Sequence, residues 1–200
     1  EEKEFRLKVV KNYYFDYSTD YIEVYDGYEC FYEYNEGAAE ECLSVYENEA
    51  GYMDFLIGSY TNMQVECPDE AILSLYHLKD LLGMIDPKSE LKIKAIASDN
   101  AIVCFRMQQM YEGIPVFGRE VSVVTNHDGR TVTLNSGYFA GINISTTPSL
   151  AAEEAGNKLV MEGYADVREE ELCIYVLENE PELAWVFYGA DVNGDTYRFI

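Results

Sequence analysis

The sequence predicts an α+β protein with helices packed on antiparallel sheets, and three observations predict it. Apolar residues recur at helical spacing over 68–84 and over about 150–162. Each of these segments is followed by short strand-like segments that end in glycine-containing turns. A helix followed by a meander therefore occurs twice, and a small β-rich segment precedes both units.

The N-terminal segment has a composition of its own. Residues 12–66 hold 13 Asp or Glu, no Lys or Arg, and 11 of the 18 tyrosines. Interleaved tyrosines and acids are strand-like, and Asp26-Gly27 and Asn35-Glu36-Gly37 are hairpin-turn sequences. Residues 38–43 are also compatible with the start of a helix. The predicted strands cover 21–25, 28–34, about 38–46 and about 52–57.

The five cysteines are widely spaced, and none lies in a Cys-x-x-Cys pair, which argues against a zinc ribbon or a thioredoxin-like site. Cys30 and Cys42 lie at equal distances from the middle of the second predicted hairpin, which would make them cross-strand neighbours. We hypothesise a disulfide between them, contributing about 3 kcal/mol because it closes a short loop. Two reduced cysteines on one face are the alternative.

The first helix is predicted to start at Pro68-Asp69-Glu70 and to stop at Gly83, and the second to end at Gly163. The apolar stripe of the first helix consists of Ala71, Leu75, Leu78 and Leu82. The turns of the meanders are predicted at Glu112-Gly113, Asp128-Gly129 and Asn193-Gly194. The strands are predicted over about 90–97, 101–111, 115–125, 130–138, 171–177, 184–191 and 196–200.

Composition excludes several classes of function. With 14 basic and 37 acidic residues, the chain is a poor partner for nucleic acid or for an anionic membrane surface. It has no apolar run of membrane-spanning length, so we expect no membrane insertion. It contains no His-Glu-x-x-His, and His77 and His127 are interpreted as exposed residues rather than metal ligands. We therefore expect no catalytic residues, no metal and no cofactor.

The segment Gln108–Gly118, Gln-Gln-Met-Tyr-Glu-Gly-Ile-Pro-Val-Phe-Gly, resembles the signature of the propeptides of thermolysin-like zinc metallopeptidases. The preceding helix, the connector 86–91 and the turn Asp128-Gly129 occur in the order of that family. Residues 145–200 resemble the PepSY domain that follows it, through 145–148, the helix start at 152–155, Trp185, Asp191 and Asn193-Gly194. The predicted division is therefore 1–67, an acidic segment; 68–144, a fungalysin/thermolysin-propeptide-like domain; and 145–200, a PepSY-like domain.

The signature residues are interpreted as architectural. Gly113 and Gly118 are assigned to turns and close packing, Pro115 to an edge and Phe117 to the core. Gln108 and Gln109 are expected to bond either the partner or the interior of the domain. The complete set of motif residues is Gln108, Gln109, Tyr111, Gly113, Pro115, Val116, Phe117 and Gly118.

The resemblance implies a non-catalytic prodomain of a secreted thermolysin-like metallopeptidase, acting as its inhibitor and folding assistant. The expected partner is the metallopeptidase catalytic domain, in cis or in trans. The alternative is a stand-alone secreted or cell-surface module of the same fold that binds or inhibits a protease. We expect an extracellular or cell-surface bacterial protein whose signal peptide is absent from this chain.

Overall fold

The computed structural model describes residues 9–16, 21–25, 42–48 and 50–200. By compactness the chain divides into two units. Unit 1 comprises Glu1–Gln108 and Arg119–Ala140, and unit 2 comprises Gln109–Gly118 and Gly141–Ile200. The division of the sequence into 1–67, 68–144 and 145–200 stays a prediction.

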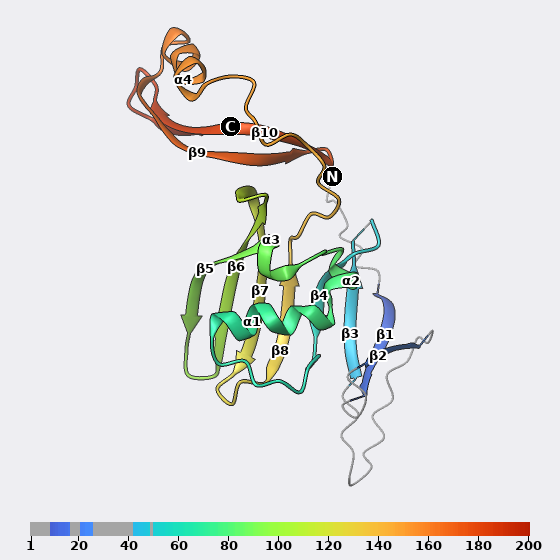
Figure 1. The fold of residues 1–200 in the computed structure, drawn as a ribbon. Helices are drawn as coiled ribbons and strands as arrows, with labels where there is room; N and C mark the ends of the chain where they lie inside the picture. Colours follow the sequence, from blue (N-terminus) through green and yellow to red (C-terminus); the bar gives the residue numbers. More distant parts are fainter. Residues whose placement is uncertain (1–8, 17–20, 26–41, 49) are drawn as a thin grey trace, which may run out of the picture. The chain divides into compact units, whose positions relative to one another are not determined.

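Unit 1 is built on a mostly antiparallel sheet with the strand order β5-β6-β7-β8-β4-β3-β1-β2 (Figure 1). The predicted strands from 90 to 138 are confirmed within a few residues, and β1 was not predicted. The strands are β1 (Val9–Asp16), β2 (Tyr21–Tyr25), β3 (Cys42–Glu47), β4 (Met53–Ile57), β5 (Leu91–Ser98), β6 (Ile102–Tyr111), β7 (Ile114–Asn126) and β8 (Thr131–Ser136).

The acidic N-terminal segment contributes to this sheet. Strand β3 pairs with both β1 and β4, and β4 pairs in turn with β8. The predicted strand 28–34, both predicted N-terminal turns, Cys30 and the side chain of Cys42 lie outside the described residues. The disulfide between Cys30 and Cys42 therefore stays a prediction.

The predicted helix over 68–84 is broken into three pieces, α1 (Pro68–Ser74), η1 (Leu75–His77) and α2 (Lys79–Leu82). Ser74 lies at the first break. Its hydroxyl donates to the carbonyl of Ala71 (2.7 Å) and lies 2.8 Å from the hydroxyl of the buried Tyr60. A serine bonded back to the preceding turn competes with the helical hydrogen bonds, which accounts for the change of helix type there.

The apolar stripe survives this break. Ala71, Leu75, Leu78 and Leu82 are each at most 1% exposed and pack into the core of unit 1. Gly83 ends α2 in the left-handed conformation, as predicted. Figure 1 shows α1 lying across the sheet, and the inward residues of β4 to β8 meet it. They include Met53, Leu56, Phe105, Met107, Val121, Val123 and Leu134.

A short helix that the sequence did not predict, α3 (Pro87–Glu90), leads into β5. It is held by Glu90, whose Oε2 accepts from the backbone N–H groups of Ile85 (3.1 Å) and Asp86 (3.4 Å). The hydroxyl of Tyr138 donates to the same oxygen (3.1 Å). Burial, and then the charge of Glu90, raise the pKa of Tyr138. This cluster fastens the start of β5 to the segment that follows β8.

Unit 2 contains α4 (Ala152–Met161), β9 (Ala165–Leu177), β10 (Glu180–Ala190) and β11 (Thr196–Phe199). The three strands form an antiparallel meander, and β9 and β10 begin earlier than predicted. The predicted turn at Asn193-Gly194 is confirmed: the Asp191 carboxylate accepts from the N–H groups of Asn193 and Asp195. Helix α4 approaches β10 at Gly156, where an added Cβ would lie 3.1 Å from the ring of Phe187.

Within the described residues, no helix is both long and apolar enough to cross a bilayer. The same residues contain no group of three or more His, Cys, Asp or Glu side chains placed to hold a metal ion.

We expect the substitution Tyr138→Phe to lower the free energy of unfolding by about 1 kcal/mol, because it removes a hydrogen bond to a carboxylate. Urea unfolding measures the change. The control is Tyr76→Phe, which removes the bond from the exposed Tyr76 to Asp86 and is expected to cost less. Folding raises the pKa of Tyr138 above the ordinary tyrosine value of about 10. The contribution of this hydroxyl to the free energy of unfolding is therefore full below about pH 10 and is lost as the pH rises toward the raised pKa. If the free energy of unfolding of the wild-type chain fell no more at alkaline pH than that of Tyr138→Phe, the predicted role of the Tyr138 hydroxyl would be wrong.

Cys173 is expected to resist thiol reagents in the folded chain. It is fully buried, and burial, followed by the charge of Glu171, raises its pKa to about 11. Reaction with Ellman's reagent near pH 8 needs the thiolate, which is then a small fraction. Peptide mass spectrometry should find the half-buried Cys104 labelled well before Cys173, with both labelled after unfolding. Equal labelling rates in the native chain would refute the assignment.

Candidate functional site

The signature segment Gln108–Gly118 forms the tip of the β6–β7 hairpin. As predicted, its turn is Glu112-Gly113, and the two residues have φ angles of 48° and 86°. Positive φ angles at both central residues define a type I′ turn, whose twist matches that of the two flanking strands. Thr146 donates from its hydroxyl to the Glu112 carboxylate (3.1 Å), which fastens the turn to the segment that precedes α4.

The two glutamines point to different surroundings, as expected for neighbours in a strand. Gln109 is 1% exposed, whereas Gln108 is half-buried. The Gln108 amide donates to the backbone carbonyl of Arg119 (2.8 Å), and its oxygen accepts from Lys94 (3.3 Å). For Gln108, the interpretation of bonds inside the domain is therefore correct.

Within Pro115-Val116-Phe117, the buried residue is Val116. It is 0% exposed and pairs in parallel with Ile174 of β9, which is also fully buried. The expectation that Phe117 fills the core was wrong, because its side chain is only half-buried. Its ring contacts Tyr175 at a centroid distance of 6.2 Å, and the Arg198 guanidinium lies 5.1 Å from its centroid. Phe117 thus takes part in a cation–π and aromatic cluster on unit 2.

Gly118 is required by its backbone conformation and not by close packing. Its φ is 70°, inside a strand, and a Cβ there would meet no heavy atom within 4 Å. Gly113 is equally open. The expectation of close packing at these two glycines was wrong, while the expectation of a turn at Gly113 was correct.

A charged cluster that the sequence did not single out lies next to Gln108. The Glu120 carboxylate is bonded by Lys94 on β5 (2.6 Å) and by Arg106 on β6 (2.6 Å). Burial by itself raises the pKa of Glu120, but the bonds from Lys94 and Arg106 outweigh it and hold the pKa below its usual value. Only the register of three strands brings these residues together, so spacing along the chain gave no signal.

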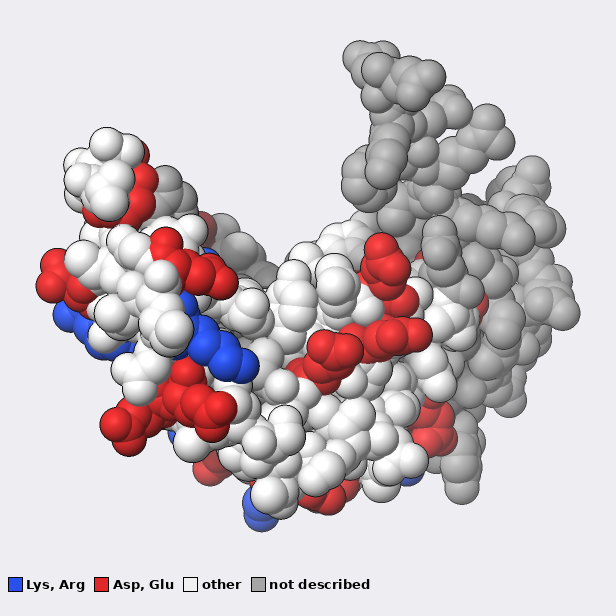
Figure 2. Space-filling model, turned by 90° about the horizontal axis from the view of Figure 1, so that it is seen from above, with Lys and Arg blue, Asp and Glu red and all other residues white. Residues whose placement is uncertain are grey.

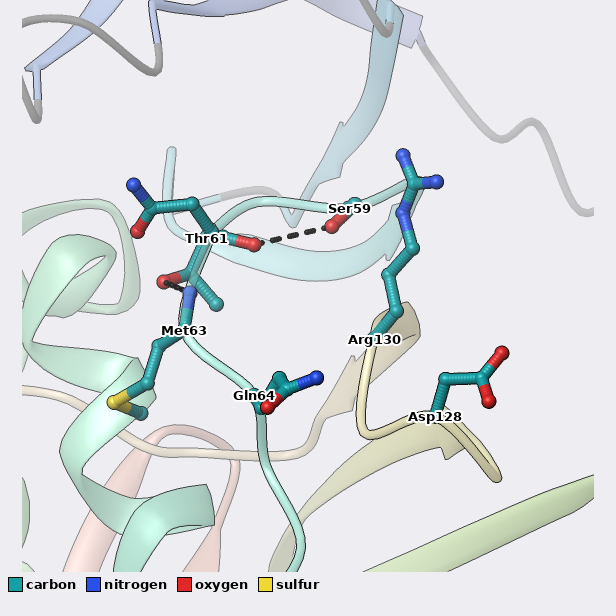
Figure 3. A pocket seen from close by; sticks show the side chains of 7 residues that line it. Ser59, Thr61, Met63, Gln64, Asp128 and Arg130 are labelled. Carbon is teal, nitrogen blue, oxygen red and sulfur yellow. Dashed lines mark hydrogen bonds between the residues drawn. The ribbon is translucent and has the colours of Figure 1, made fainter.

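Two hollows flank the point where the loop after β4 crosses the β7–β8 turn. The N–H of Val65 donates to the carbonyl of Gly129 (2.7 Å), and an added Cβ at Gly129 would lie 3.0 Å from that nitrogen. The first hollow, about 300 Å³, is bordered by Ser59, Thr61, Met63, Gln64, Asp128 and Arg130 (Figure 3). The second, about 340 Å³, is lined by Val65, Phe105, Thr125 and His127 among others.

Polar side chains at both hollows are bonded to neighbouring groups. Ser59 donates to the carbonyl of Thr61 (3.2 Å), a bond drawn in Figure 3, and lies 3.3 Å from the hydroxyl of Thr131. The exposed His127 lies within hydrogen-bond distance of the carbonyl of Asp99 (2.8 Å). His77 is exposed as well, so both histidines occupy the surface positions expected of them.

We expect Gln109→Ala to lower the free energy of unfolding by about 2–3 kcal/mol, because it empties a buried site and leaves polar partners unsatisfied. Gln108→Ala is the matched control and should cost about 0.5–1.5 kcal/mol, since its amide is half-exposed. Urea unfolding of both variants measures the difference. Equal losses would show that burial does not separate the roles of the two glutamines.

Comparison with known proteins locates a family motif on this hairpin. Residues 90–138 match the model of the Fungalysin/Thermolysin Propeptide Motif. The matched segment begins at Glu90 and ends at Tyr138, the two residues joined by the hydrogen bond described above. It covers β5 to β8 and contains the whole signature.

Among solved structures, the chain is similar to the Bacillus megaterium YpeB C-terminal domain. The two are 17% identical, the match covers 98% of this chain and 84% of that one, and the TM-score is 0.39. At that score the likeness carries no argument, and the PepSY-like assignment of 145–200 stays a prediction. Residues 90–138 of this chain carry the fungalysin/thermolysin propeptide motif.

Proposed function

We propose that this chain is a non-catalytic prodomain that inhibits a thermolysin-like metallopeptidase and assists its folding. The observation that carries the proposal is the propeptide motif at 90–138. A preformed sheet that binds the folded enzyme and not its unfolded chain would stabilise the enzyme by mass action. Covering the cleft of the enzyme would keep it inactive until the prodomain is removed.

The described part of the chain supports an architectural role for the signature. The signature side chains are engaged in turns, in packing and in hydrogen bonds, as a scaffold requires. A secreted or cell-surface location belongs to the same proposal, since thermolysin-like peptidases act outside the cytoplasm. In this proposal the partner is the catalytic domain, in cis or in trans.

The test is titration of the chain into purified thermolysin and, separately, into a fungalysin catalytic domain. Hydrolysis of a fluorogenic peptide is expected to fall as the chain is added, and the refolding yield of the denatured peptidase is expected to rise. Intact-mass spectrometry must show that the chain stays uncleaved, because a good substrate would also slow hydrolysis. An unrelated protein of similar negative charge is the control. No effect on the activity or refolding of either enzyme would overturn the proposal.

A further inference from the structure

Among the described residues of unit 1, no helix packs against one face of the sheet. Helices α1, α2 and α3 pack on the face that carries the core, as Figure 1 shows for the described residues. The opposite face carries the alternate residues of the same strands. Ile57, Ile96 and Ile102 are 44%, 53% and 38% exposed there, so this open face carries exposed apolar side chains.

The motif that forms much of this face is neutral in a strongly acidic chain. Residues 90–138 hold five basic and five acidic residues, which leaves nine basic and 32 acidic residues for the rest. On the face drawn in Figure 2, acidic side chains accordingly form several groups and basic ones few. A partner that carries carboxylates would be repelled by most of this molecule and least by the motif.

Lys94 and Arg106 are the charged centre of the open face. Their side chains are 49% and 48% exposed, and both bond the single carboxylate of Glu120. Arg106 uses Nε (3.1 Å) and Nη2 (2.6 Å) on one oxygen of Glu120, so its Nη1 is not used in the bonds to Glu120. Lys94 donates to Glu120 and Gln108, which uses two of its three N–H groups. The cluster therefore has a net positive charge and donors that are still available.

We propose that Lys94 and Arg106 anchor a carboxylate of the docked peptidase domain, with the exposed isoleucines of the same face as its apolar surround. This inference rests on the proposed function and names the surface that would bind the peptidase domain. Glu120 holds the Lys94 and Arg106 side chains in place through its bonds to both. It also competes with the incoming carboxylate for their N–H groups. The shared network fixes both side chains before docking, which lowers the entropy lost on binding.

If Glu120 competes with the incoming carboxylate, removing its charge should strengthen binding. A cluster that serves only to stabilise the fold would not give this result. Glu120→Gln keeps an oxygen that can accept from Lys94 and Arg106 but removes the competing charge. Binding of the peptidase should then tighten severalfold, although the chain itself loses a bonded carboxylate. Lys94→Gln with Arg106→Gln should weaken binding by about tenfold and reduce its dependence on salt.

The experiment measures the inhibition constant and the association rate for thermolysin and the fungalysin catalytic domain, at low salt and at about 0.2 M salt. The matched control is Lys79→Gln with Lys88→Gln, which changes the net charge equally but on helices α2 and α3, on the other face of the unit 1 sheet. Circular dichroism confirms that each variant is folded. Tighter binding by Glu120→Gln, weaker binding by the double variant and an unchanged control would support the anchor.

The failures are distinguishable. No binding by the wild-type chain would overturn the proposed function itself. Wild-type binding that neither Glu120→Gln nor the double variant alters would leave the proposed function standing and overturn the anchor. Self-association of the wild-type chain in analytical ultracentrifugation that the double variant abolishes would assign the face to a second copy, which also overturns it.

Discussion

The architecture of unit 1 depends on the burial of one helical stripe against one face of its sheet. Each of the stripe's leucines is almost fully removed from water, and each such side chain contributes about 1.5–3 kcal/mol. This packing holds even though the helix changes type at Ser74, because the stripe is defined by position and not by an unbroken ladder of helical bonds. An antiparallel sheet needs only one buried face, so its other face is free to meet water or a partner.

The two ends of the propeptide motif are in contact. Its first and last residues meet in the Glu90–Tyr138 hydrogen bond, and the same Glu90 carboxylate organises the turn before α3. Its middle is the signature hairpin, whose tip pairs with β9 through Val116. The motif thus supplies strands to one compact unit and a hairpin tip to the other. The signature residues are engaged at the tip, whereas the available charge lies further down the strands.

What the sequence could predict was local. Glycine turns set the hairpins after β6, β7 and β10, and the period of apolar residues identified the buried stripe of α1 to α2. The sequence could not reveal β1 or the pairing of β4 with β8, because those contacts join segments far apart in the chain. At the site, it located the signature but assigned Phe117 to the core, whereas the buried residue is Val116. It missed Lys94, Arg106 and Glu120, which meet only across three strands.

The size of the net charge does not decide what approaches the open face. At physiological salt the Debye length is about 8 Å, so most of the formal charge of −23 is screened before a partner makes contact. The charges next to the contact then control the final approach, and the cluster of Lys94, Arg106 and Glu120 offers two cations against one carboxylate. At contact distance, the acidic remainder disfavours the approach of other acidic surfaces to the rest of the chain. A chain of this charge can therefore present a surface that accepts a carboxylate.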